Sequence, residues 1–75
     1  MMFTRITANS EQMGGVPCIR GLRIPVATVL NKVAAGMSED DILDDFPMLE
    51  REDIREALQY AAALVNERYI PLVKA

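Results

Sequence analysis

Few side chains in this sequence could carry covalent chemistry. Cys18 is the single thiol, and the positive charge of nearby Arg20 could lower its pKa and make it more nucleophilic. The chain has no histidine, so the usual general base that would activate such a thiol at neutral pH is missing. We therefore predict that the chain is not an enzyme and that Cys18 is a small, buried or half-buried structural residue, with a reactive thiol as the alternative.

Metal and cofactor sites are not predicted either. Structural zinc needs several Cys or His ligands, and this chain has one Cys and no His. Asp40 and Asp44, like Asp41 and Asp45, lie four residues apart and could bind a divalent cation through oxygen. A solvated acidic face is the simpler interpretation, because the carboxylates repel each other and no glycine-rich loop would surround an ion. We predict no metal and no cofactor.

The segment from Gly14 to Val26 is the most unusual part of the chain. It holds three of the four glycines and two of the four prolines, which predicts a specific, tight backbone path. It is not a phosphate-binding loop, because the Gly-Lys-Ser/Thr ending is missing. Arg20 and Arg23 flank Gly21 and could reach phosphate oxygens or base edges. They could equally form ion pairs with carboxylates further along the chain, and the residues alone leave both interpretations open.

Charge is divided unevenly along the chain. Residues 1–36 hold four basic side chains and one acidic one, whereas residues 37–75 hold four basic and ten acidic ones. Such a chain can offer a basic surface to one partner and an acidic surface to another, although the division also suits solubility alone. The candidate DNA-binding residues are Arg5, Arg20, Arg23, Lys32, Arg51 and Arg55.

Short elements must position these side chains. Alternation of apolar and polar residues over 3–7 predicts a strand, and 18–19 and 22–24 could form two more. The apolar spacing after Pro25 predicts a helix at about 25–35, which Gly36 ends in the left-handed conformation.

Two further helices are expected. Ser38 is a good N-cap for a helix at about 39–45, which Pro47 ends. A third helix covers about 51–68, and Tyr60 widens its apolar surface enough to contact both the core and a second subunit. Its predicted buried stripe consists of Ile54, Ala57, Leu58, Ala61, Leu64 and Val65.

Together these elements predict a mainly α fold: a three-helix, helix-turn-helix-like domain with short N-terminal β-strands. The single domain of residues 1–75 divides into strands and a Gly/Pro-rich loop (1–24), three helices (25–68) and an extended tail (69–75). A core this small favours association, so we expect a homodimer. The candidate partner-binding residues are Tyr60, Leu64, Tyr69, Ile70, Leu72 and Val73.

The cellular compartment can also be predicted. One cysteine excludes an internal disulfide, which suits a reducing compartment. No apolar run approaches the roughly 18 residues that a membrane span needs, and no signal-peptide stretch is present near the N-terminus. We expect a cytoplasmic protein without a membrane partner.

The order of these motifs resembles domain-of-unknown-function family 433, small prokaryotic proteins grouped with antitoxins. The family signature, roughly Gly-Gly-Lys-Pro-Cys-Ile-Arg-Gly-Thr-Arg-Ile-Pro-Val, corresponds to residues 14–26, with Val16 and Leu22 replacing the usual lysine and threonine. The likeness covers about residues 5–65. Its later features are an Ala-Gly helix end, an acidic Ile-Leu helix, an aromatic-Pro break and an Asp-Ile-x-x-Ala-Leu-x-Tyr-Ala helix, at 35–38, 42–43, 46–47 and 53–61.

The resemblance implies a helix-turn-helix-like fold that is often dimeric. It also implies an antitoxin of a type II toxin–antitoxin pair, which neutralises a nuclease-like toxin and binds its own promoter. The expected partners are therefore a cognate toxin protein and promoter DNA. The alternative is a dimeric protein-interaction module without DNA binding, because phosphate would repel a recognition helix rich in carboxylates.

Overall fold

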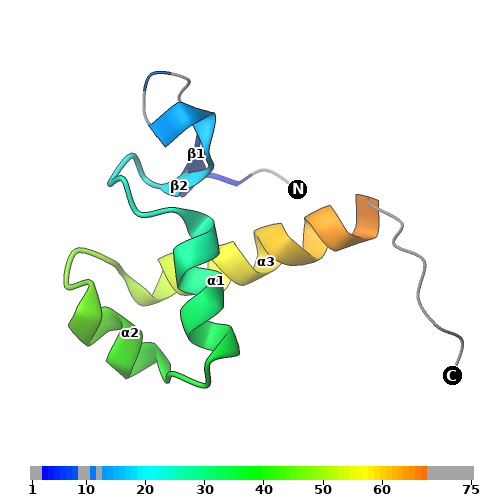
Figure 1. Ribbon diagram of the computed structural model, residues 1–75. Coiled ribbons are helices and arrows are strands. Elements are labelled where there is room, and N and C mark those ends of the chain that lie inside the picture. The colour runs from blue at the N-terminus through cyan, green and yellow to red at the C-terminus, as the bar shows by residue number, and fades with distance from the viewer. Residues whose placement is uncertain (1–2, 9–10, 12, 68–75) are drawn as a thin grey trace, which may run out of the picture.

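Three helices and a short two-stranded ribbon make up the fold. The computed structural model describes residues 3–8, 11 and 13–67 of the chain. The elements follow in the order β1 (Ile6–Thr7), η1 (Met13–Gly15), β2 (Cys18–Ile19), α1 (Val26–Ala34), α2 (Glu39–Asp45) and α3 (Arg51–Glu67) (Figure 1). The predicted mainly α, three-helix fold with short N-terminal strands is confirmed, and the predicted bounds of β2 and α2 match the structure.

Helix α1 covers Val26–Ala34, one residue shorter at each end than the predicted 25–35. Pro25 precedes it with an extended backbone, at φ −62° and ψ 143°. At the other end Gly36 has φ +88°, and its N–H donates to the Val33 carbonyl at 3.0 Å. The Met37 N–H donates to the Lys32 carbonyl at 3.1 Å, which completes a Schellman motif. Gly36 therefore fixes the angle at which the chain turns from α1 towards α2.

The N-termini of α2 and α3 are capped by side chains. Ser38 Oγ accepts a hydrogen bond from the Asp41 N–H at 3.1 Å, as predicted for an N-cap. At α3 the Asp53 carboxylate accepts from the Glu50 N–H at 2.8 Å, which is one half of a capping box. The start of α3 is thus held by the side chain of Asp53.

The N-terminal ribbon pairs β1 with β2 in antiparallel register, Ile6 opposite Ile19 and Thr7 opposite Cys18. A turn follows β2, closed by a 2.8 Å hydrogen bond from the Leu22 N–H to the Ile19 carbonyl. Its central residues have φ +44° and +70°, as in a type I′ turn, and Gly21 occupies the second of these positions.

Two predictions about this ribbon are corrected by the structure. The first strand covers Ile6–Thr7 rather than all of 3–7. The expected third strand at 22–24 is absent, because Arg23 has φ +61° and leaves the β region. An isolated bridge between Cys18 and Pro25 is formed instead.

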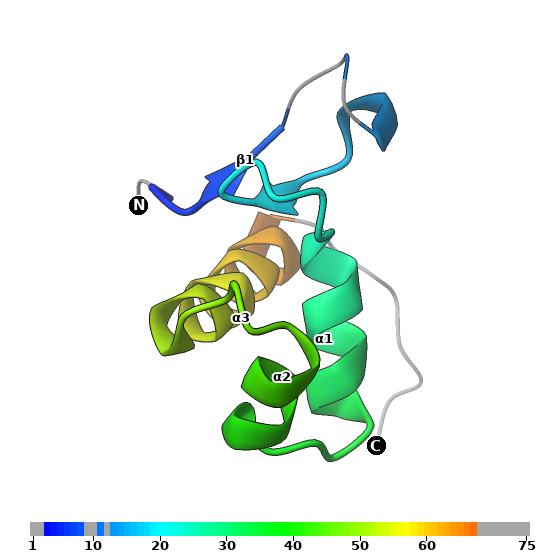
Figure 2. The same cartoon turned by 90° about the vertical axis from the view of Figure 1, so that its left-hand side faces the viewer.

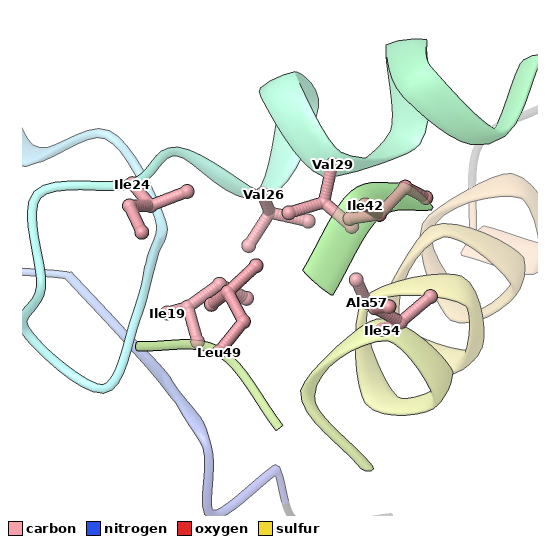
Figure 3. Close-up of a cluster of buried hydrophobic side chains, with 8 residues drawn as sticks. All are labelled: Ile19, Ile24, Val26, Val29, Ile42, Leu49, Ile54 and Ala57. Atoms are coloured by element: carbon pink, nitrogen blue, oxygen red, sulfur yellow. The ribbon is translucent and has the colours of Figure 1, made fainter. Parts of the chain in front are cut away.

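The hydrophobic core lies where the ribbon, α1, α2 and the first half of α3 meet, and it is aliphatic (Figure 3). Figure 2 shows α1 beside α3, with α2 across one end and the ribbon near the N-terminus of α1. Burying each large aliphatic side chain stabilises the fold by about 2 kcal/mol. The buried cluster comprises Ile19, Ile24, Val26, Val29, Ile42, Leu49, Ile54 and Ala57.

The buried stripe of α3 is shorter than predicted. Ile54 and Ala57 are buried, but Leu58, Leu64 and Val65 are 42%, 37% and 68% exposed. In the second half of α3, Tyr60 packs against the core, but the described elements leave Leu64 and Val65 open to solvent. The prediction that these three residues are buried was wrong, and the exposed surface that they leave is the starting point for function.

Candidate protein-binding groove

An apolar groove lies between α1, the second half of α3 and the residues that precede β2. It has a volume of about 370 Å³. Apart from the Tyr60 hydroxyl, every lining side chain is a hydrocarbon, and Val16, Leu64 and Val65 are exposed at its edges. The lining residues are Val16, Pro17, Val26, Ala27, Leu30, Tyr60, Ala61, Leu64 and Val65.

Helical spacing and one aromatic contact shape this groove. Tyr60, Ala61, Leu64 and Val65 repeat at intervals of three to four residues, so they share one side of α3. The ring of Phe3 meets the Tyr60 ring edge to face, with centroids 5.3 Å apart, and supports its position. The result is a site within the usual size range of ligand pockets, suited to apolar side chains of a partner.

Only some of the predicted partner-binding residues can be placed. Tyr60 and Leu64 line the groove, so the structure brings these two together on one wall. Tyr69, Ile70, Leu72 and Val73 lie outside the described residues. The opposite wall, which includes Val16 and Leu30, was not predicted. The one sequence signal for this wall was Val16, which stands where the family signature has lysine.

The candidate DNA-binding cations on the helices are held by neighbouring carboxylates. Lys32 Nζ lies 3.0 Å from Asp45 Oδ2 and 5.3 Å from the centroid of the Phe46 ring. Arg51 pairs with Asp40 at 2.6 Å and with Glu39 at 2.8 Å, and these hydrogen bonds raise the pKa of its guanidinium.

Arg55 Nε lies 3.7 Å from Glu39 Oε2, in a looser ion pair between an exposed guanidinium and a half-buried carboxylate. The predicted acidic face of α2 is therefore largely a set of counter-ions for α1 and α3. Phosphate groups would have to compete with these carboxylates for all three helical cations.

Arg5 and Arg20 converge on one buried carboxylate, Asp53, which is 0% exposed. Arg20 donates to it through Nε at 3.1 Å and through Nη2 at 3.0 Å. Arg5 Nη1 donates to it at 3.0 Å and to Glu50 at 2.7 Å. Arg20 Nη2 also donates to the Met48 carbonyl at 2.8 Å. The two arginines come from the N-terminal ribbon, so this cluster fastens the ribbon to the start of α3.

The cluster shifts the pKa of each of its charged members. Burial alone would raise the pKa of Asp53, but hydrogen bonds from Arg20, the Glu50 N–H and Arg5 outweigh it, and the pKa is lowered. Hydrogen bonds to Glu50 and Asp53 raise the pKa of Arg5, and the bond to Asp53 raises that of Arg20. All three groups are therefore charged at neutral pH.

Arg23 differs from the other candidates. Its side chain is exposed and forms no ion pair with any residue that the structure describes. Of the two interpretations of the loop arginines, Arg20 follows the ion-pair alternative, whereas Arg23 pairs with no carboxylate of the described residues.

Acidic side chains dominate the charges that remain. Within residues 3–8, 11 and 13–67, four exposed carboxylates form no ion pair. Arg23 is the one arginine or lysine of that part of the chain in the same position. The surface is therefore suited to a basic partner more than to phosphate. The four carboxylates belong to Asp41, Asp44, Glu52 and Glu67.

Comparison with known proteins identifies the family. The family described as "Protein of unknown function (DUF433)" matches residues 6–61. The chain belongs to the DUF433 family. The resemblance read from the sequence is thereby confirmed.

This DUF433 chain is also similar to two individual proteins. It is 43% identical over 58 residues to "Uncharacterized protein y4eO" of Sinorhizobium fredii, a match that covers 77% of this chain and 26% of that protein. The chain thus spans about a quarter of the length of that relative. The crystal structure of a DUF433 member from Anabaena variabilis superimposes with a TM-score of 0.75 at 28% identity, covering 84% of this chain and 62% of that one.

The residue that sequence reasoning missed in this DUF433 chain is Asp53. Its signal was present, because it stands three residues after Glu50 at the start of a predicted helix, where a carboxylate can close a capping box. Nothing in the spacing of Arg5 and Arg20 indicated that both would reach it.

Cys18 is 2% exposed, and its thiol donates to the Val16 carbonyl at 3.3 Å, in agreement with its predicted burial. No helix among the described residues is long and apolar enough to cross a membrane. The same residues contain no group of three or more Cys, Asp or Glu placed to hold a metal ion.

Proposed function

We propose that this DUF433 chain is the antitoxin of a type II toxin–antitoxin pair, and that it binds its partner protein through the groove between α1 and α3. The observation that carries the proposal is the groove itself. Exposed contiguous apolar surface on a small domain typically marks a site of interaction. A site lined by Tyr60 and Leu64, with almost no polar group, suits a protein segment with apolar anchors.

Charge supports a basic partner. A nuclease binds a polyanion, so its substrate groove is expected to be basic and to attract an acidic protein. The net charge of this chain is −3, and its cations are mostly paired internally. Electrostatic attraction would then speed association and orient the complex, while the apolar groove supplies affinity.

Promoter binding remains a prediction with less support. Five of the six candidate DNA-binding residues form ion pairs within the fold, and Arg23 is the exception among them. Within the described residues, one unpaired arginine would neutralise few phosphates and give a shallow salt dependence. A protein-interaction module without DNA binding is therefore a second candidate, favoured by this pairing.

A matched pair of substitutions on α3 tests the proposal. Leu64→Asp places a carboxylate on the groove wall, whereas Leu58→Asp makes the same change on the same helix outside the groove. Both leucines are partly exposed, at 37% and 42%, so neither change should unfold the domain. The partner protein to use is the purified product of the adjacent reading frame, with binding measured by calorimetry and neutralisation by recovery of growth when the two genes are co-expressed.

We expect Leu64→Asp to weaken binding by at least about 30-fold, because a buried anchor contributes about 2 kcal/mol or more. Leu58→Asp should bind as the unchanged protein does. Absence of binding by the unchanged protein would remove the antitoxin proposal, and equal effects of the two substitutions would remove the groove from it. A gel shift on the upstream DNA separates the two candidate functions.

A further inference from the structure

We infer that residues 68–75 of the same chain occupy the groove when no partner is bound, so that partner binding displaces them. The inference rests on the proposed function, because it concerns regulation of the same groove. It starts from what the groove lacks: among the described residues, nothing covers Leu64 and Val65. It commits to one occupant, the segment of this chain that directly follows α3.

The segment begins at the edge of the groove. Helix α3 ends at Glu67, two residues after Val65, which is itself a lining residue. Four of the next eight residues are large and apolar, with one cation on each side of them. The segment is Arg68, Tyr69, Ile70, Pro71, Leu72, Val73, Lys74 and Ala75.

The length of the segment matches the groove. On α3 the wall from Tyr60 to Val65 rises about 7.5 Å, at 1.5 Å per residue. An extended stretch from Ile70 to Val73 spans about 10 Å, at 3.3 Å per residue. Arg68 and Tyr69 remain to reverse the chain, so that this stretch can run back along α3.

The chemistry of the segment also matches. The groove offers almost no polar atoms, and Pro71 has no backbone N–H that would need a hydrogen bond there. Its fixed φ lowers the conformational entropy lost on docking.

Covalent attachment decides between this occupant and an external one in the absence of a high-affinity partner. A short linker gives an attached segment an effective concentration on the order of 1 mM. An attached segment whose intrinsic dissociation constant is about tenfold below that concentration is docked about ten times as often as it is open. An external molecule would then bind about tenfold more weakly than to an open groove.

Nuclear Overhauser effects in the full chain test the docking directly. We expect cross-peaks between the Leu72 methyl groups and the Tyr60 ring that do not change with protein concentration. A mixture of labelled and unlabelled chains, recorded with isotope filtering, should show none between chains. Absence of these cross-peaks, or their appearance only between chains, would overturn the inference.

A second measurement uses substitutions that leave the core untouched. Ile70→Asn combined with Leu72→Asn should open the groove and raise the affinity for the uncharged dye N-phenyl-1-naphthylamine about tenfold, as the docked fraction requires. Lys74→Asn, the same new side chain in the same segment, should leave the dye affinity unchanged. Equal dye affinities for all three proteins would overturn the inference. If cross-peaks are absent while the adjacent gene product still binds and Leu64→Asp weakens that binding, only this inference fails; the reverse result removes the proposed function alone.

Discussion

Replacing Asp53 by asparagine should destabilise the domain more than any other substitution of a single charged residue. The change keeps the shape of the side chain but removes the charge on which Arg5 and Arg20 converge. It also replaces one acceptor oxygen with an amide that cannot accept from the Glu50 N–H or from a guanidinium. Two cations and the first turn of α3 lose a partner together.

The magnitude follows from the burial of the partners. Removing one member of a buried ion pair typically costs 3–5 kcal/mol, since the other charge is left without compensation. Here Asp53 is 0% exposed, but the side chains of Arg5 and Arg20 are 29% and 33% exposed and can turn towards water. We therefore expect about 2–3 kcal/mol, which for a domain of this size lowers Tm by about 10–20 °C.

Urea and thermal unfolding, followed by far-ultraviolet circular dichroism, measure this loss. The matched control is Asp44→Asn, because Asp44 is an exposed carboxylate without an ion pair in the described part of the chain. The control should change the free energy of unfolding by less than about 0.5 kcal/mol. If Asp53→Asn falls within the same limit, the cluster does not hold the ribbon and the reasoning is refuted.

Three further predictions concern pH, backbone conformation and DNA. Because the folded pKa of Asp53 is lowered, its stabilising effect is complete above the unfolded pKa of about 4 and disappears as pH falls through the folded value, so the stability gap between the unchanged protein and Asp53→Asn should shrink in acid-titrated unfolding curves. Gly36→Ala should lower the free energy of unfolding by about 1 kcal/mol, because φ is +88° there; a Cβ would meet no atom, so steric overlap cannot account for the loss. If DNA is bound, Arg23→Ala should reduce the slope of log affinity against log salt by about 0.9 in gel shifts, whereas an unchanged slope would exclude Arg23 from the phosphate contacts.

Local signals in the sequence predicted most of the fold. Gly36, Ser38 and Pro47 each act within a few residues, and the helix bounds that they predict agree with the structure to within about one residue. The prediction of a third strand was wrong for a local reason too. Alternation over 22–24 indicated an extended backbone, but Arg23 takes a positive φ as the chain leaves the turn at Gly21.

The site could be predicted only in part, because its contacts join distant positions. Arg20 and Asp53 are 33 residues apart, and no spacing rule relates a loop to the first turn of a later helix. Apolar periodicity correctly placed Leu64 on one side of α3 with Ile54 and Ala57. It could not show that the described elements cover only the first half of that side. The groove exists because the apolar side of α3 is longer than the part of it that the described elements bury.

The ion pairs of the ribbon have two consequences that oppose DNA binding and favour protein binding. By converging on Asp53, Arg5 and Arg20 give up the positive charge that phosphate would need. The same contacts hold the ribbon against α3, and the residues just before β2, Val16 and Pro17, then form part of the opposite wall of the groove. Asp53→Asn should therefore weaken partner binding, although Asp53 does not line the groove. The loss should exceed that of a groove-distant variant with equal stability, which separates positioning of the wall from partial unfolding.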